Sequence, residues 1–206
     1  GVERKKQWLK KRFKEGLVFR KLDERGKVFI EYMPAEQAWR PIVAPDFLAV
    51  HCLWVSGKFA KHGYGRALMQ SCFDDAKKQK KHGVVVASAK KKRPFLSDPK
   101  FLKHLGFKIE DSSSEYNLWV YRFKKNGTEP AHFSQSVHTP PAAKKKEAML
   151  SRFHDQCPFN HHWAGEMAKV IEKQGFEIEL EHLKTLAKAK KSPSPLGAFS
   201  LERNGA

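Results

Sequence analysis

The sequence predicts an α/β (α+β) protein: a mixed sheet with helices packed on it, followed by a small β-α-β unit. Two segments, Phe47–Val55 and Gly83–Ser88, are almost continuously apolar, as strands covered on both faces are. Between them, Arg66–Lys81 repeats apolar residues at helical spacing, so a helix is expected to connect the two buried strands. The chain has 206 residues, of which 40% are hydrophobic, and this is enough for a packed core in one large or two small domains.

The N-terminal segment is predicted to form a helix followed by a hairpin. In residues 3–15, Trp8 and Phe13 lie among many lysines at a spacing that suits a helix with one narrow apolar stripe. The alternating segments 17–22 and 27–33 on either side of a polar turn then indicate a β-hairpin.

After the second buried strand, the pattern indicates further elements and then a change of character. Residues 98–105 suit a short helix stopped by Gly106, and residues 107–110 and 116–123 suit two strands. Residues 124–141 contain Gly127 and three prolines with scattered Ser and Thr, which is typical of a linker.

These patterns divide the chain into a first domain over residues 1–126, a linker over 127–143 and a second domain over 144–206. The second domain is expected to hold strands at 148–153, 176–180 and 196–202, with helices at 163–174 and 183–190.

The charge of the chain favours anionic partners. There are 40 Lys and Arg against 22 Asp and Glu, a formal charge of +18, and 29 of the basic residues lie in the first 130 positions. Such a field attracts nucleic acid or phosphorylated cofactors. No apolar run approaches the roughly 20 residues that cross a bilayer, and the N-terminus lacks the apolar region of a secretory signal. The three widely spaced cysteines suit a reducing cytoplasm.

The segment Leu53–Met69, LWVSGKFAKHGYGRALM, carries the most chemical information. A buried strand runs into a loop with small and basic residues, which opens directly into a helix. Gly63 and Gly65 let a ligand approach the backbone, and the helix N-terminus offers unpaired N–H groups and a partial positive charge, so a phosphate site is expected. The spacing fits neither a P-loop nor a dinucleotide fingerprint.

The order of elements over residues 3–125, with HGYGRAL at 62–68 and LGF at 105–107, resembles the GNAT acetyltransferases. The resemblance implies the acyl-CoA N-acyltransferase fold, here without its first strand, and acetyl-CoA as co-substrate. It implies a strand that pairs with the pantetheine arm and a loop that binds the pyrophosphate, through these residues: Leu53, Trp54, Val55, Lys61, His62, Gly63, Tyr64, Gly65 and Arg66. Ala60 and Leu102 depart from the family pattern, at a phosphate contact and at a tyrosine general acid respectively.

Three strand residues are candidates for the catalytic centre. The carboxylate of Glu31 could accept the proton of the amine, directly or through water. His51 and Cys52 lie on the buried strand that the resemblance places beside the acetyl group. For all three, an ordinary packing or surface role is the alternative interpretation.

The second domain adds a further resemblance. Cys157-Pro158 before a helix and Ser194-Pro195 before a strand are similar to the cysteine and the cis-proline of thioredoxin-like folds, and with the first domain they resemble the YoaP-like acetyltransferases. Asn160 stands where a resolving cysteine would be, which disfavours a disulfide oxidoreductase. The spacing of His154, Cys157, His161 and His162 matches no zinc pattern, so no metal is expected. An incomplete thioredoxin-like lobe with an accessory role is predicted.

Together these observations predict a cytoplasmic, acetyl-CoA-dependent N-acetyltransferase that acts by direct attack of an amine on the thioester. The acceptor is a small-molecule or peptide amine that the sequence does not specify, no membrane is involved, and the oligomeric state is open. Two alternatives remain: a basic nucleic-acid-binding protein, and a thiol-redox protein that uses Cys157.

Overall fold

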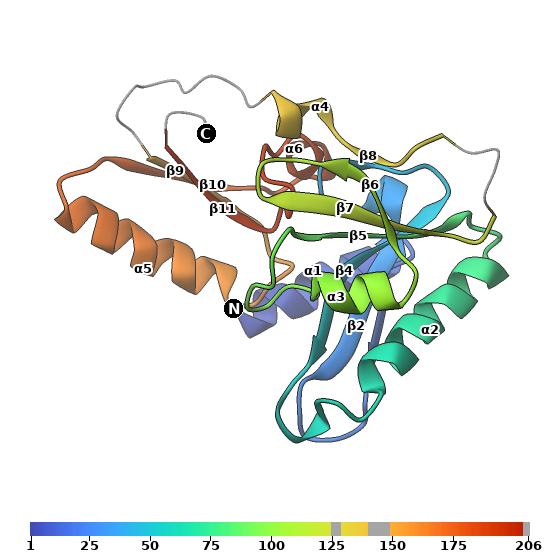
Figure 1. Ribbon diagram of the computed structural model, residues 1–206. Coiled ribbons are helices and arrows are strands. Elements are labelled where there is room, and N and C mark those ends of the chain that lie inside the picture. Colours follow the sequence, from blue (N-terminus) through green and yellow to red (C-terminus); the bar gives the residue numbers. More distant parts are fainter. Residues whose placement is uncertain (125–128, 140–148, 204–206) are drawn as a thin grey trace. The chain divides into compact units, whose positions relative to one another are not determined.

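The computed structural model describes residues 1–124, 129–139 and 149–203 (Figure 1). The chain divides into two compact units. The large-sheet unit comprises Glu15–Ala38 and Ile42–His132. The small-sheet unit comprises Gly1–Lys14, Trp39–Pro41 and Phe133–Ala206. Each unit has its own sheet and is described by itself.

The large-sheet unit is built on a six-stranded mixed sheet of order β1-β2-β4-β5-β7-β6. The central strands β4 and β5 are parallel, and all other neighbours in this sheet are antiparallel. The mixed sheet confirms the predicted fold class. Its strands are β1 (Val18–Lys21), β2 (Val28–Pro34), β4 (Phe47–Val55), β5 (Gly83–Ala89), β6 (Lys108–Ser112) and β7 (Tyr116–Arg122).

Within its described residues, this unit contains the α-helices α2 and α3. Helix α2 (Tyr64–Lys78) connects β4 to β5 and packs against β2, β4 and β5. Helix α3 (Pro99–His104) starts at Asp98, whose carboxylate accepts the backbone N–H of Lys100 at 2.8 Å. The minor elements of this region are η1 (Ala35–Gln37), β3 (Ile42–Val43) and η2 (Gly57–Phe59).

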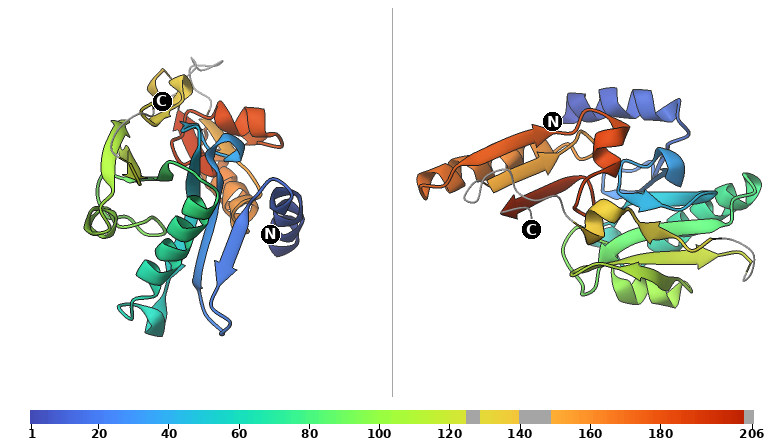
Figure 2. Two further views of the ribbon diagram at one scale, coloured as in Figure 1. Left: turned by 90° about the vertical axis from the view of Figure 1, so that its right-hand side faces the viewer. Right: turned by 90° about the horizontal axis from the view of Figure 1, so that it is seen from above.

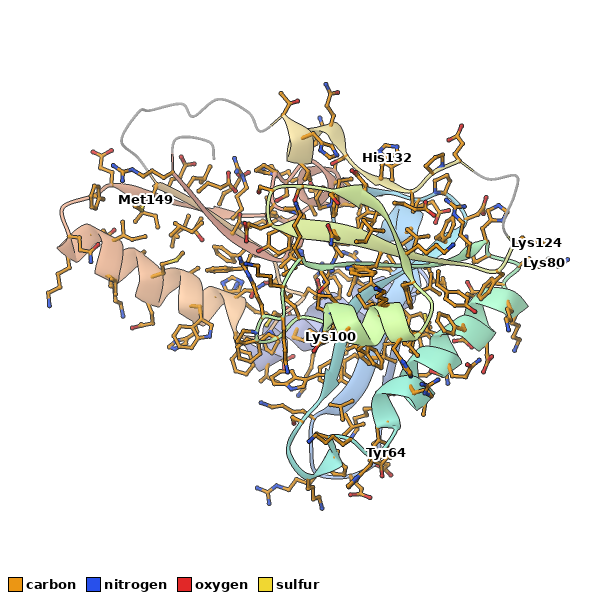
Figure 3. All side chains as sticks on the ribbon, in the orientation of Figure 1. Tyr64, Lys80, Lys100, Lys124, His132 and Met149 are labelled. Carbon is orange, nitrogen blue, oxygen red and sulfur yellow. The ribbon has the colours of Figure 1, made fainter. Side chains whose placement is uncertain are left out.

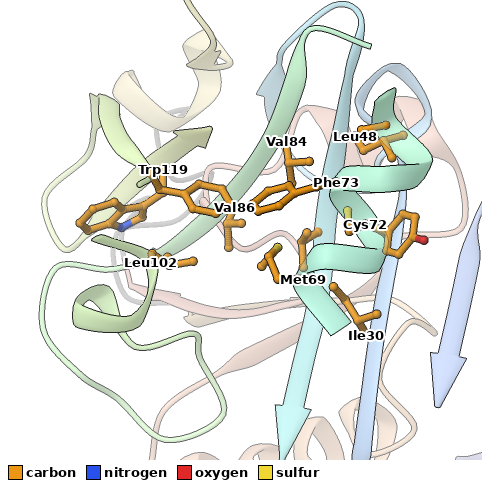
Figure 4. Close-up of a cluster of buried hydrophobic side chains, with 13 residues drawn as sticks. Ile30, Leu48, Met69, Cys72, Phe73, Val84, Val86, Leu102 and Trp119 are labelled. Atoms are coloured by element: carbon orange, nitrogen blue, oxygen red, sulfur yellow. The ribbon is translucent and has the colours of Figure 1, made fainter. Parts of the chain in front are cut away.

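The hydrophobic core of the large-sheet unit lies between α2 and the sheet (Figure 4). The buried side of α2 presents Met69, Cys72, Phe73 and Ala76, which recur at helical spacing. They meet Ile30, Leu48, Val84, Val86, Leu102 and Trp119, among others. Burial raises the pKa of the Cys72 thiol, so this cysteine is an inert core residue.

A polar cluster joins α2 to the first two strands. The hydroxyl of the fully buried Tyr32 donates to Asp75 Oδ2 at 2.5 Å, and Arg20 Nη2 donates to the same oxygen at 2.8 Å. Burial alone would raise the pKa of Asp75, but the hydrogen bonds from Tyr32 and Arg20 outweigh it and lower that pKa. The ionised carboxylate therefore stabilises the folded state.

We expect the substitution Asp75→Asn to lower the free energy of unfolding by about 1.5–3 kcal/mol at pH 7, the usual contribution of hydrogen bonds to a charged group. Because the pKa of Asp75 is lowered in the folded state, its contribution is present above the pKa of the unfolded chain and is lost as the pH falls. Urea unfolding at pH 7 and at pH 3 measures both effects. The matched control is Asp74→Asn, because Asp74 is the exposed neighbour and accepts a hydrogen bond from Gln70 of the same helix. Equal stabilities of the two variants at pH 7 would contradict this role.

The small-sheet unit holds a β-α-β crossover followed by one antiparallel strand (Figure 2). Strand β9 (Met149–Phe153) leads into α5 (Asn160–Lys173), and β10 (Ile178–His182) then pairs parallel to β9. After the short helix α6 (Leu186–Lys190), β11 (Phe199–Arg203) pairs antiparallel to β9, which gives the order β10-β9-β11. This is the predicted arrangement of a parallel unit and one further strand.

The structure places more of the chain in the small-sheet unit than the predicted second domain contained. Helix α1 (Val2–Phe13) belongs to it, with Trp8 packed in a buried cluster with Arg12, Trp39 and His154. The expected linker contains strand β8 (His132–Phe133) and helix α4 (Gln135–His138), where Phe133 and Val137 are buried. The rest of that segment lies largely outside the described residues.

No helix within the described ranges is both long and apolar enough to cross a membrane.

Candidate functional site

The candidate site begins where two parallel strands of the large sheet part. Strand β4 pairs with β5 only from Phe47 to Val50, opposite Gly83 to Val86. Beyond Val50, β4 continues to Val55 and stays paired with β2 on its other side. Among the described residues, the pairing of β4 with β5 does not extend to Leu53–Val55. This part of the strand therefore offers backbone groups to which an extended ligand can hydrogen-bond.

A β-bulge lies at this same point. Glu31 on β2 is opposite Cys52 on β4, but the next residue, Tyr32, is opposite Val50, so His51 is an extra residue on β4. The side chains of His51 and Glu31 are both buried, and His51 Nδ1 lies 3.5 Å from Glu31 Oε1. Two of the three predicted catalytic residues thus form a pair where the strands part. The third, Cys52, is half-buried.

The loop after β4 is held against the β1–β2 hairpin. Ser56 donates its backbone N–H to Lys27 O at 3.0 Å, and the buried ring of Phe59 lies against Gly26 and edge-on to Tyr64. Gly26 has no Cβ, and an added Cβ there would collide with the Phe59 ring. These contacts fix the position at which helix α2 begins.

The N-terminus of α2 has the geometry of an anion site. Gly63 adopts φ +81° and precedes Tyr64, the first helical residue, which Figure 3 labels at the start of α2. The first intrahelical bond runs from Ala67 N to Gly63 O, so the preceding amides have no acceptor within the helix. No side chain caps this terminus and its first turn holds no acidic residue. The partial positive charge of the helix end is therefore available to an anion.

Basic side chains surround this terminus. Lys61 and His62 are exposed, and Arg66 Nη2 lies 2.7 Å from His104 Nε2 on α3. The end of β4 is adjacent to the helix start, because a Cβ added to Gly65 would lie 3.9 Å from Val55 Cγ2 and 3.5 Å from Phe101 Cζ. The predicted pantetheine and pyrophosphate segments are therefore continuous in space.

The structure adds residues that the sequence analysis did not name. His104 and Phe101 contact the glycine segment from α3, and no local pattern connects these two helices. Leu102, whose position the family resemblance associates with a tyrosine, is fully buried in the core cluster and supplies no acid.

The small-sheet unit contains the residues on which the thioredoxin-like interpretation is based, together with His154. Cys157 is half-buried just before α5, and its carbonyl accepts the backbone N–H of Asn160 at 3.3 Å. The expected cis-proline is wrong for this chain: among the described residues no peptide bond is cis, so Pro195 follows a trans bond. His154 is fully buried, with Nε2 3.2 Å from Trp39 O. The thioredoxin-like interpretation stays a prediction.

Comparisons with known proteins agree with the geometry of the large-sheet unit. The profile of the family described as "Acetyltransferase (GNAT) family" matches residues 2–107. The chain is 38% identical over 205 residues to "Uncharacterized N-acetyltransferase YoaP" of Bacillus subtilis (strain 168), across 99% of this chain and 80% of that relative.

The chain is also similar to solved structures, at lower sequence identity than to this relative. A putative acetyltransferase of the GNAT family from Desulfovibrio desulfuricans matches with a TM-score of 0.45 and 14% identity, over 56% of this chain and 77% of that one. The ribosomal-protein-S18-alanine N-acetyltransferase of Escherichia coli matches with a TM-score of 0.41 and 14% identity, over 59% and 78% of the two chains.

Proposed function

Because this chain belongs to the GNAT family of acetyltransferases, we propose that it transfers the acetyl group of acetyl-CoA to a small-molecule or peptide amine by direct attack on the thioester. The observation that carries this proposal is the parting of β4 from β5 beyond Val50, with the Glu31–His51 pair at the point where the strands part and the start of α2 beside the end of β4.

The Leu53–Val55 part of β4 and the start of α2 suit the two halves of the co-substrate. The pantetheine arm carries amide groups that can pair with the backbone of Leu53–Val55, as a further strand would. The pyrophosphate then reaches the amides at Gly63–Arg66, where the helix end and the basic side chains favour negative charge. The thioester is directed toward His51 and the bulge.

The reaction requires a neutral amine and a polarised carbonyl. The amine nitrogen attacks the acetyl carbon, the C–S bond breaks, and the amine proton must leave the nitrogen while the CoA sulfur gains one. Glu31 is the proposed proton acceptor, directly or through water, with His51 as its contact at 3.5 Å. A backbone N–H group of β4 is proposed to polarise the carbonyl oxygen, and holding both reactants on β4 supplies proximity.

Calorimetric titration of the purified chain with acetyl-CoA, dephospho-CoA and pantetheine tests the proposal. We expect acetyl-CoA and dephospho-CoA to bind, and pantetheine, which lacks the pyrophosphate, to bind at least tenfold more weakly, a difference of about 1.4 kcal/mol. Mass spectrometry of the purified protein should also detect CoA that has co-purified. Absence of any binding by acetyl-CoA, or equal affinities of the three ligands, would contradict the placement.

Incubation with acetyl-CoA in the absence of an amine separates direct attack from an acetyl-enzyme mechanism through Cys52. We expect the intact mass of the protein to stay unchanged, because the thioester carbonyl should wait for the acceptor amine. A stable mass increase of one acetyl group that maps to Cys52 would instead assign a covalent intermediate.

A further inference from the structure

A cluster of three side chains in the small-sheet unit has no part in the proposed acetyl transfer. It consists of Asp155, His161 and His182, whose candidate ligand atoms all lie within 4.8 Å of one another. The three residues come from the loop after β9, the first turn of α5 and the last position of β10.

The topology explains why these residues meet. Strands β9 and β10 are parallel, and Phe153 is the register partner of His182 at their carboxyl ends. The crossover helix α5 begins at that same edge, because the chain leaves β9 there. In open α/β sheets, this edge beyond the carboxyl ends of parallel strands is where ligands usually bind.

The candidate ligand atoms lie near one another. Asp155 Oδ1 is hydrogen-bonded to His161 Nε2 at 2.6 Å and lies 3.2 Å from His182 Nε2. Ligands at about 2.0–2.2 Å from a tetrahedral Zn²⁺ are about 3.3 Å apart, so a metal ion needs only small side-chain shifts to fit between them. Two imidazoles and one carboxylate leave a further position for water or another ligand, as in catalytic zinc sites.

The surroundings of the His182 ring support a role as a metal ligand. Its Nε2 is buried and has no hydrogen-bond partner among the described residues, although it lies beside the Asp155 carboxylate. The Phe153 ring stacks on His182 and meets His161 edge-on, which fixes both imidazoles.

We infer that Asp155, His161 and His182 form a binding site for a divalent first-row transition metal ion, for which Zn²⁺ is the probe. The spacing of the candidate ligands near Cys157 in the sequence predicts no metal, because it matches no zinc pattern. Of that set the cluster contains His161 alone; Asp155 and His182 join it through the fold.

Calorimetric titration of the metal-free full chain, prepared without a histidine tag, with ZnCl₂ tests the site. We expect about one Zn²⁺ per chain, and affinity at least tenfold lower in Asp155→Asn and in His182→Asn, since each removes one of three ligands. The matched control is His162→Asn, because His162 is exposed on α5 next to His161 and lies outside the cluster. Its Zn²⁺ affinity should equal that of the unmodified chain.

A second measurement needs no variant. Addition of Zn²⁺ to the unmodified chain should shift the histidine ring resonances of His161 and His182 in NMR spectra and leave those of His162 unchanged. The inference is overturned if the unmodified chain binds no Zn²⁺, if Asp155→Asn and His182→Asn bind it as tightly as the control, or if His162 shifts in place of the other two. None of these readouts depends on acetyl transfer.

Discussion

Replacing Gly63 by valine is expected to lower the affinity for acetyl-CoA at least tenfold, about 1.4 kcal/mol. Gly63 has φ +81°, and no atom of the described residues lies within 4 Å of a Cβ added there. The added side chain therefore enters the space before the α2 terminus, where the phosphate oxygens are proposed to bind. Gly65→Val tests the same surface from within the first turn and is expected to have a similar effect.

The matched control is Gly57→Val. Gly57 also has a positive φ, +61°, and also has open space around its Cβ position, but it lies outside the proposed pyrophosphate segment. The backbone strain is therefore similar in the two variants, and only the proximity to the phosphate differs. Calorimetry with acetyl-CoA measures the affinities, and circular dichroism checks the fold. If Gly63→Val binds acetyl-CoA like Gly57→Val does, the pyrophosphate does not bind at this terminus.

Replacing Glu31 by glutamine is expected to lower kcat by about 10²–10⁴-fold, the usual contribution of a positioned general base. The amide keeps the size of the carboxylate but cannot accept the amine proton. The affinity for acetyl-CoA should stay within about twofold, because the pyrophosphate and pantetheine contacts lie elsewhere on β4 and α2. Initial rates, once an acceptor amine is identified, and calorimetry measure the two effects.

A buried carboxylate beside a histidine can also stabilise the fold, so the experiment must separate this structural role from the role of Glu31 as a general base. Glu31→Asp keeps the acid one methylene shorter and should recover part of the rate lost in Glu31→Gln. The pH–rate profile of the glutamine variant should also lose its dependence on deprotonation of this acid. The exposed Glu172→Gln is the control for loss of a carboxylate. A glutamine variant with lower stability but unchanged kcat and pH profile would make Glu31 a structural residue.

Much of the large-sheet unit follows from local patterns. The apolar run Phe47–Val55 forms β4 with the bounds that the sequence predicts, and Gly83–Ala89 forms β5. Helix α2 begins at Tyr64, two residues before the predicted start, because Gly63 takes the left-handed conformation and the chain turns into the helix immediately. Hydrophobic periodicity and glycine placement act over a few residues, which is why they can be read directly.

The candidate site was predictable in part for the same reason. The pyrophosphate segment is contiguous in the chain, so its charges and glycines are visible in the sequence. The Glu31–His51 contact depends on a β-bulge that shifts the β2–β4 register by one residue, and no local pattern of either strand specifies that shift. The sequence indicated Glu31 and His51 as separate candidates, and the register of β2 with β4 places them side by side.

The sequence alone determined the order of the main elements and the glycine segment at the start of α2, since both depend on short-range periodicity and backbone preference, and the mixed sheet was implied by the family resemblance. Only the tertiary structure decided that Trp8 of α1 packs with Trp39 and His154, and that Asp155 and His182 meet at one edge of the small sheet. These contacts join residues far apart in the chain. Their partners are selected by burial and strand pairing in the folded protein, which the local pattern of one segment does not encode.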